Sequence, residues 1–263
     1  MNRTAIERVK NPDNKTPGFS WNPVTGCLGP RGDGVRCSYC YAHKLANGRL
    51  AERYLANENI AEDKDWSMCN KSNPFYPRFW EERLLAPIQH KKPCGIFTVD
   101  MGELFGSWIP EEWQEAIFRV IRECPQHRFY LLTKQPQNLI KFSPFPENCF
   151  VGVTATNQTM HNEAIVCLSA IKAKVKYISY EPLLEYIVPQ YAYNLEEIQW
   201  VVIGSQTKPT VLPKLEWVQE IIEAANEASI PVFLKNNLEA AVNGGYMFSM
   251  QGNKGVLRQE MPG

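Results

Sequence analysis

The chain has 263 residues, of which 44% are hydrophobic and 21% are charged, enough to bury one large core. Its 28 basic and 28 acidic residues cancel, which argues against a protein that coats nucleic acid or a membrane surface. The start lacks the apolar core of a signal peptide, and no apolar run approaches the roughly 18 residues that span a bilayer. We expect a cytoplasmic protein without a membrane partner, folded as a single domain over residues 1–263.

The first motif along the chain is a cysteine triplet in the run WNPVTGCLGPRGDGVRCSYCYAHK, which begins within an expected first strand at 19–26. Cys27, Cys37 and Cys40 are three thiolate donors, the last two in Cys-x-x-Cys spacing. Three thiolates can hold three irons of a four-iron cluster and leave the fourth iron open to a small molecule. The pattern therefore indicates chemistry at this loop.

Other roles for the triplet stay open. A structural zinc site uses four ligands, and the sequence offers neither a second Cys-x-x-Cys nor a closely spaced His pair. A thioredoxin-like pair would use only Cys37 and Cys40, but it normally follows a strand rather than a Gly- and Arg-rich loop. A third possible role is that of inert thiols in the core. We expect that role for most of the five other cysteines, and a second cluster that uses some of them is the alternative. They are Cys69, Cys94, Cys124, Cys149 and Cys167.

Residues 58–94 break the regular pattern. They are rich in Asn, Pro, Trp and Arg and contain one short helical stretch near 82–87. We interpret them as an insertion after the first βα unit that packs over one end of the fold and helps cover the site.

From residue 95 onward, short apolar runs alternate with helical stretches. The runs are almost continuously apolar, which is typical of parallel strands buried on both faces: 95–100, 128–134, 150–156, 175–181, 200–205 and 231–236. The helical stretches have apolar residues at three-to-four spacing: 108–124, 159–173 and 214–228. Repeated units of this kind predict an α/β fold, a complete or partial (β/α) barrel of about six to seven parallel strands.

Polar residues follow each of these strands, at the end that forms the reaction face of a (β/α) barrel. Helix capping is the alternative for any one of them. Lys134, Glu181 and Lys235 directly adjoin apolar runs, where an unpaired charge is unfavourable. We expect these three candidate catalytic residues to pair with one another or with a charged ligand. The complete set is Asp100, Gly102, Glu103, Thr133, Lys134, Thr154, Thr156, Asn157, Glu181, Gly204, Ser205, Gln206, Lys235 and Asn236.

The motifs WNPVTGC, CSYCYA, VDMGELFG, FYLLTKQP, GVTATNQ, YISYEPLL and FLKN resemble the radical S-adenosylmethionine (SAM) superfamily. They resemble most closely a phage-associated, poorly characterised radical-SAM-like family once grouped as of unknown function, over roughly residues 19–240. The resemblance implies a [4Fe-4S] cluster on Cys27, Cys37 and Cys40, with SAM bound to the open iron. It implies reductive cleavage of SAM to a 5′-deoxyadenosyl radical that abstracts hydrogen from a substrate.

The resemblance also assigns roles to side chains that contact SAM. Tyr39 matches the aromatic residue beside the adenine. Asp100, Gly102 and Glu103 resemble the segment that receives the SAM amino group.

Residues later in the chain also match positions that contact ligands in the superfamily. Asn157 and Glu181 fall where other members contact the SAM ribose or carboxylate, and Lys134 and Lys235 are expected partners of the substrate or a carboxylate. The nine-residue gap after Cys27 departs from the usual Cys-x3-Cys-x2-Cys. Because of this longer gap, it stays open whether Cys27 is the first ligand of the cluster. It also stays open whether Arg31, Asp33 or Arg36 of the enlarged loop contributes to substrate binding.

The implied partners are a small-molecule or nucleotide-type substrate and an electron donor such as flavodoxin or ferredoxin. A nucleic acid or peptide stays open as the substrate, although the neutral net charge argues against extensive duplex contacts. One alternative is a zinc- or cluster-containing nucleic-acid-binding module without catalysis. Another is a (β/α) hydrolase or lyase that uses Glu103, Glu181 and Lys134 for acid–base chemistry, which leaves the cysteines unexplained.

Overall fold

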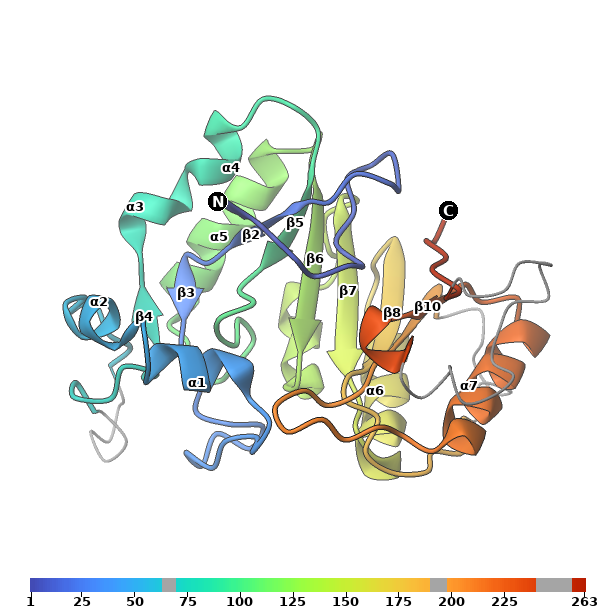
Figure 1. The fold of residues 1–263 in the computed structure, drawn as a ribbon. Coiled ribbons are helices and arrows are strands. Elements are labelled where there is room, and N and C mark those ends of the chain that lie inside the picture. The colour runs from blue at the N-terminus through green and yellow to red at the C-terminus, as the bar shows by residue number, and fades with distance from the viewer. Residues whose placement is uncertain (63–69, 190–197, 240–256) are drawn as a thin grey trace.

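The computed structural model describes residues 1–62, 70–189, 198–239 and 257–263 and centres on an eight-stranded sheet (Figure 1). From β2 to β10 the neighbouring strands pair in parallel, and β1 pairs antiparallel with β2. The sheet order follows the chain: β1 (Asn2–Arg3), β2 (Phe19–Trp21), β5 (Gly95–Thr98), β6 (Arg128–Thr133), β7 (Cys149–Thr154), β8 (Val175–Tyr180), β9 (Trp200–Ile203) and β10 (Val232–Leu234). The predicted α/β fold with a mostly parallel sheet is confirmed.

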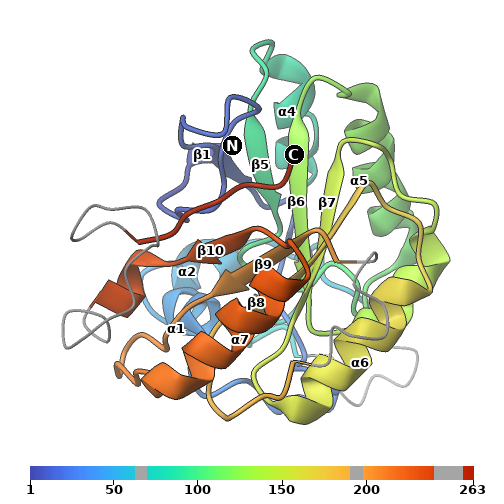
Figure 2. The same cartoon turned by 90° about the vertical axis from the view of Figure 1, so that its right-hand side faces the viewer.

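The helices that connect the strands lie on one face of the sheet. They are α5 (Glu111–Glu123), α6 (Gln158–Ser169) and α7 (Leu215–Glu227), and Figure 2 shows them side by side along that face. A sheet whose strands follow chain order with right-handed connections places its helices on the same side. Between β6 and β7 the connection is a 3₁₀ helix, η1 (Pro136–Phe142), which we did not predict from the sequence.

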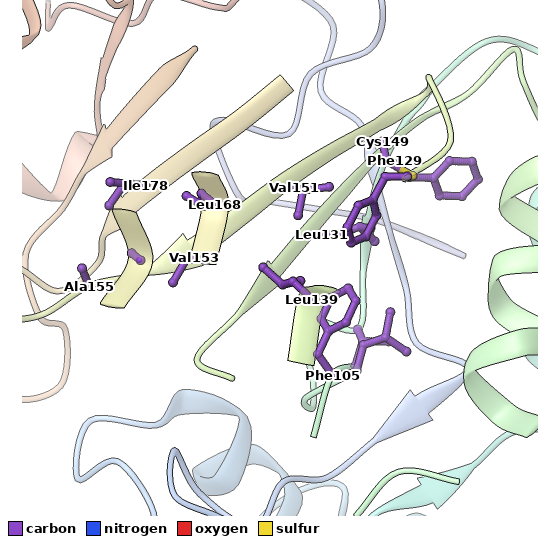
Figure 3. Close-up of a cluster of buried hydrophobic side chains, with 14 of the residues drawn as sticks. Phe105, Phe129, Leu131, Leu139, Cys149, Val151, Val153, Ala155, Leu168 and Ile178 are labelled. Carbon is purple, nitrogen blue, oxygen red and sulfur yellow. The ribbon is translucent and has the colours of Figure 1, made fainter. Parts of the chain in front are cut away.

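The main hydrophobic core fills the space between the sheet and these helices. Every second side chain of a strand points toward the helices, because successive side chains of a strand lie on opposite faces of the sheet. Figure 3 shows part of this core, with side chains from β6, β7, β8, η1 and α6: Phe129, Leu131, Cys149, Val151, Val153, Ile178, Leu139 and Leu168. Cys94 and Cys124 are also buried there, as expected for core thiols.

The opposite face of the sheet carries a second core made largely of aromatic rings. We call Tyr130, Phe150, Tyr177, Trp200 and Phe233 the aromatic floor. Its rings touch from strand to strand, with centroids 5.3 Å apart for Tyr177 and Trp200 and for Tyr130 and Phe150. The N-terminal segment adds Val9 to this core. The floor lies toward the amino ends of the strands, and it leaves the carboxyl ends free for a site.

The expected first strand at 19–26 is divided in two. Phe19–Trp21 joins the main sheet as β2, whereas β3 (Val24–Thr25) pairs with β4 (Arg78–Phe79) in a separate two-stranded sheet. Pro23 lies between them and has no backbone N–H to donate to a sheet. The prediction of one continuous strand was wrong because apolar residues on both sides of this proline belong to two sheets.

The predicted insertion at 58–94 contains β4 and two short helices, α3 (Glu81–Leu84) and α4 (Ala86–Gln89). They agree with the helical stretch expected near 82–87. The segment follows α1 (Tyr41–Ala46) and α2 (Ala51–Leu55), and its Phe75 reaches the candidate site. Residues 63–69, including Cys69, lie outside the described residues.

Residues 257–263 run along β10 at the edge of the sheet. The Leu234 amide donates to the Arg258 carbonyl over 2.7 Å, and the Glu260 amide donates to the Val232 carbonyl over 3.0 Å. Trp200 Nε1 donates to the Glu260 carbonyl over 2.9 Å. The segment therefore covers a strand edge that would otherwise expose unpaired backbone groups. In the parts of the chain that the structure describes, none of the helices has the length and apolar character needed to cross a bilayer.

Candidate functional site

A cavity of about 270 Å³ opens at the carboxyl ends of the parallel strands. Its wall combines the cysteine loop with residues that follow five strands, β5, β6, β8, β9 and β10. Nearly all of the predicted site residues line it: Cys27, Cys37, Tyr39, Cys40, Asp100, Gly102, Glu103, Lys134, Glu181 and Lys235. Segments that are far apart in the sequence thus meet where the strand-end argument expected them.

The cysteine loop presents its thiols with backbone amides directed at the sulfurs. The Gly29 amide donates to Cys27 Sγ over 3.2 Å, and the His43 amide donates to Cys40 Sγ over 3.3 Å at the start of α1. Hydrogen bonds of this kind stabilise thiolates and tune iron–sulfur clusters. Burial, followed by the nearby Glu103, raises the pKa of Cys27 to about 12. A bound cation would therefore be needed to ionise this thiol near neutral pH.

The described residues contain no group of three or more His, Cys, Asp or Glu side chains already arranged to hold a metal ion. The three thiols therefore share the cavity wall without being gathered around one point. Their chemistry suits iron or zinc, and their side chains would have to turn toward a common centre to bind either.

Two glycines bring the cysteine loop against the segment after β5. The Gly26 amide donates to the Met101 carbonyl over 2.9 Å, and the Glu103 amide donates to the Gly26 carbonyl over 3.1 Å. Gly26 has φ +93°, and a Cβ on Gly102 would lie 2.7 Å from the Gly26 carbonyl oxygen. Only glycine permits this backbone contact. It places Cys27 beside Glu103.

The chain turns sharply where β5 reaches the cavity. Val99 has φ 62°, a left-handed conformation that is strained for a β-branched residue. The next residue, Asp100, accepts a hydrogen bond from Asn22 Nδ2 over 2.6 Å, and its carbonyl accepts one from the Tyr41 hydroxyl over 2.7 Å. Burial raises the pKa of Asp100, although side-chain hydrogen bonds from Asn22 and Tyr41 oppose the shift. Asp100 is thus held by the protein itself.

Glu103 is a buried carboxylate at the centre of the cavity wall. Its Oε1 accepts hydrogen bonds from Thr133 Oγ1 over 2.6 Å and from the Phe105 amide over 3.0 Å, and its Oε2 accepts one from the Lys134 amide over 3.0 Å. Burial raises the pKa of Glu103 against these bonds. Because a carboxylate accepts about four hydrogen bonds, Oε2 keeps capacity for a donor from a ligand.

An ion network occupies the wall next to β8 and β10. Glu181 pairs with Arg8, and its Oε1 lies 2.7 Å from Lys235 Nζ. Burial alone would raise the pKa of Glu181, but Arg8 and Lys235 outweigh it and hold the pKa at about 2. The expected pairing of Glu181 with Lys235 is confirmed. Lys134 lies apart, with its Nζ 5.9 Å from the Tyr39 ring centre and no carboxylate of the described residues within ion-pair distance.

Of the residues assigned to the cluster, SAM or catalysis, Asn157 alone is outside the cavity lining. The lining also lacks Arg31 and Asp33 of the cysteine loop and Thr156, Gly204 and Asn236 of the strand-end set. The side-chain oxygen of Asn157 accepts a hydrogen bond from the Met160 amide over 2.9 Å and caps α6. This position matches the capping alternative noted for polar residues after strands. Its assignment to SAM stays a prediction without support from the geometry.

Arg8 and Asn237 are two polar residues of the wall that sequence reasoning missed. Arg8 comes from the N-terminal stretch, which offers no strand or helix pattern that would place it at the site. Asn237 follows β10 and exchanges hydrogen bonds with the backbone of Ser205, which ties the loops after β9 and β10 together. A polar residue just beyond a buried strand was the available signal for Asn237. Arg36 of the cysteine loop, left open from the sequence, does line the cavity.

A family model matches residues 14–254, a stretch that includes the cysteine loop and every strand end of the cavity. The chain belongs to the DUF5131 family. Its description is a protein of unknown function, and Glu7 and Arg8 precede the matched residues. No curated protein and no solved structure matches the chain. Membership of DUF5131 therefore assigns no chemistry, and the argument for function depends on the cavity.

Proposed function

We propose that this protein is a radical SAM enzyme that uses a [4Fe-4S] cluster on Cys27, Cys37 and Cys40. The observation that carries the proposal is that these three cysteines line one cavity together with Gly102 and Glu103. The residues come from two segments whose motifs resemble that superfamily, and the cavity lies at the carboxyl ends of parallel strands, where such folds place their reactions.

The surrounding residues support this chemistry by their positions. Amides of Gly29 and His43 hydrogen-bond to two of the sulfurs, and the remaining acceptor capacity of Glu103 suits the amino group of SAM. Tyr39 lines the same cavity, where its ring would contact the adenine of SAM. A cluster held by these cysteines would supply the electron for reductive cleavage of SAM, which would yield a 5′-deoxyadenosyl radical for hydrogen abstraction. Phe97 and Leu132 line the cavity and pack with the aromatic floor, and their apolar side chains help to exclude water from a reactive species.

We further propose that the sheet forms a partial (β/α) barrel. The strands follow chain order, the connecting helices share one face, and aromatic side chains fill the other face in a layer, as they do inside a barrel. A doubly wound sheet would instead distribute its helices over both faces.

The enzyme would work in the cytoplasm, where thiols are kept reduced. An electron donor such as flavodoxin or ferredoxin would supply the electron. The substrate would be a small molecule or nucleotide, with nucleic acid and peptide as further candidates. These assignments follow from the proposed chemistry and are tested with it.

The first test is the iron content of Cys37→Ala after anaerobic reconstitution, with Cys167→Ala as the matched control because Cys167 is not on the cavity wall. We expect about four irons and four sulfides per chain in the wild type and the control, and a large loss in Cys37→Ala. Reduction with dithionite in the presence of SAM should release 5′-deoxyadenosine only from the proteins that hold the cluster.

One zinc per chain and no iron would contradict the proposal. That result would favour the alternative, a zinc-containing nucleic-acid-binding module without catalysis. A cluster that forms equally well in Cys37→Ala would show that other residues hold it.

A further inference from the structure

The cavity wall next to β8 and β10 is lined by more cations than carboxylates. Arg8, Glu181 and Lys235 meet there, with side chains only 4%, 14% and 18% exposed. Of the residues that line the cavity at this wall, two are cations and one is a carboxylate. Buried charge is unfavourable unless it is balanced, so this wall favours an anion.

A second carboxylate, Glu7, lies outside the cavity lining and balances this charge only loosely. Glu7 Oε2 lies 3.6 Å from Lys235 Nζ, beyond hydrogen-bond distance, whereas Glu181 Oε1 lies 2.7 Å from it. Elsewhere on the wall, Arg36 and Lys134 add two cations against Asp100 and Glu103. The cavity lining as a whole is therefore not neutralised by its own carboxylates.

Lys235 is held where its ammonium can donate a hydrogen bond to a ligand in the cavity. Three partners fix Glu181 in place, because Arg8 and Ser179 Oγ bind its Oε2 and Lys235 binds its Oε1. The ammonium of Lys235 has three N–H groups; among the described residues Glu181 accepts from one over 2.7 Å, and Glu7 Oε2 lies 3.6 Å away. The fixed Glu181 thus holds Lys235 at the cavity with donor capacity to spare.

We propose that Lys235, oriented by Glu181 and Arg8, binds the anionic group of a small substrate, a carboxylate or a phosphate. The inference depends on the proposed function only in calling the bound molecule a substrate. The anion site itself needs no cluster, so it can be tested on iron-free protein. Its failure and the failure of the radical SAM proposal are then separate results.

The test is calorimetric titration of inorganic phosphate and of acetate into the iron-free, full-length protein at low ionic strength, where charge attraction is least screened. Lys235→Met should weaken binding about tenfold or more, the effect of losing one charge-assisted hydrogen bond. Glu7→Gln should tighten binding severalfold, because it removes a competing carboxylate. The controls are two exposed residues outside the cavity, Lys172→Met and Glu52→Gln, which should bind as the wild type does.

The opposite effects expected at Lys235 and Glu7 separate ligand binding from a purely structural role. If Lys235→Met does not fold, Glu7→Gln still decides the question. Binding of phosphate alone would indicate a phosphorylated substrate, and binding of acetate alone a carboxylate; either supports the proposal. No binding of either anion to the wild type, or unchanged binding in Glu7→Gln, would overturn it.

Discussion

His161 is a neutral imidazole held inside the protein. It lies on α6, almost fully buried, with Nδ1 2.9 Å from the Tyr180 hydroxyl. Burial lowers the pKa of His161 to about 4 from an ordinary value of 6.5. The unfolded chain therefore takes up a proton at this residue before the folded chain does. Stability is full above pH 6.5 and falls as the pH decreases toward 4.

The change His161→Gln should remove this part of the pH dependence. Between pH 6.5 and 4 the wild type should lose about 3 kcal/mol of unfolding free energy through this residue, since each pH unit is worth about 1.4 kcal/mol. The measurement is urea denaturation at several pH values, with the variant and the wild type compared above pH 7 as the reference. If the unfolding free energies of variant and wild type depend on pH in the same way down to pH 4, the pKa of His161 is not lowered in the folded protein.

Side chains that follow a buried strand could be predicted as site residues, whereas those from irregular segments could not. Glu181 and Lys235 were predicted because each directly follows a buried run, and the geometry brings them together. Arg8 could not be found in this way, because the N-terminal segment reaches the cavity through tertiary packing alone. Asn157 satisfies the same pattern as Glu181 but caps a helix, and the pattern does not separate the two roles.

At the scale of elements, apolar runs identified the parallel strands but not their ends. The predicted run at 150–156 ends as β7 at Thr154, and the run at 200–205 ends as β9 at Ile203. The residues after these strands, such as Ala155 and Gly204, are small and do not interrupt the apolar run in the sequence. The backbone has already left the sheet there and turns into the loops of the cavity. The 3₁₀ helix η1 begins at Pro136, and nothing in its short sequence distinguishes it from a loop.

Gly152 in β7 makes room for the aromatic floor. A Cβ at this position would lie 2.2 Å from the ring of Tyr177 on the neighbouring strand. We expect Gly152→Ala to destabilise the fold by about 1–3 kcal/mol, as overpacking of a core does. Chemical denaturation of the single variant would measure this loss.

A double-mutant cycle with Tyr177→Leu tests the cause. If the clash with the ring is responsible, Gly152→Ala should be much less destabilising in the Tyr177→Leu background, although that background is itself weakened. Equal losses in both backgrounds would assign the effect to the backbone of β7 instead.

At the scale of the whole molecule, the two ends of the described chain pack against the same sheet. Val9 joins the aromatic floor, and residues 257–263 cover the edge of β10. Removing residues 257–263 would break the hydrogen bonds of Leu234, Glu260 and Trp200 and expose apolar surface. We expect a loss of at least about 3 kcal/mol, from bonds worth about 1 kcal/mol each and the exposed surface.

The measurement is the urea midpoint of the shortened chain. Removal of Gly263 alone is the control, because this residue is exposed and has nothing within 4 Å of a Cβ position. An unchanged midpoint in the chain without residues 257–263 would mean that the covered edge contributes nothing to stability.

The aromatic floor also has a kinetic consequence. Phe97 and Leu132 of the cavity wall pack with this floor. If that packing blocks the sheet side of the cavity, two ligands that occupy it share one route of entry and exit. The ligand that lies deeper has to arrive first and depart last. If the cavity holds both a cofactor and a substrate, turnover should follow a compulsory order, with product inhibition patterns that differ for the two molecules.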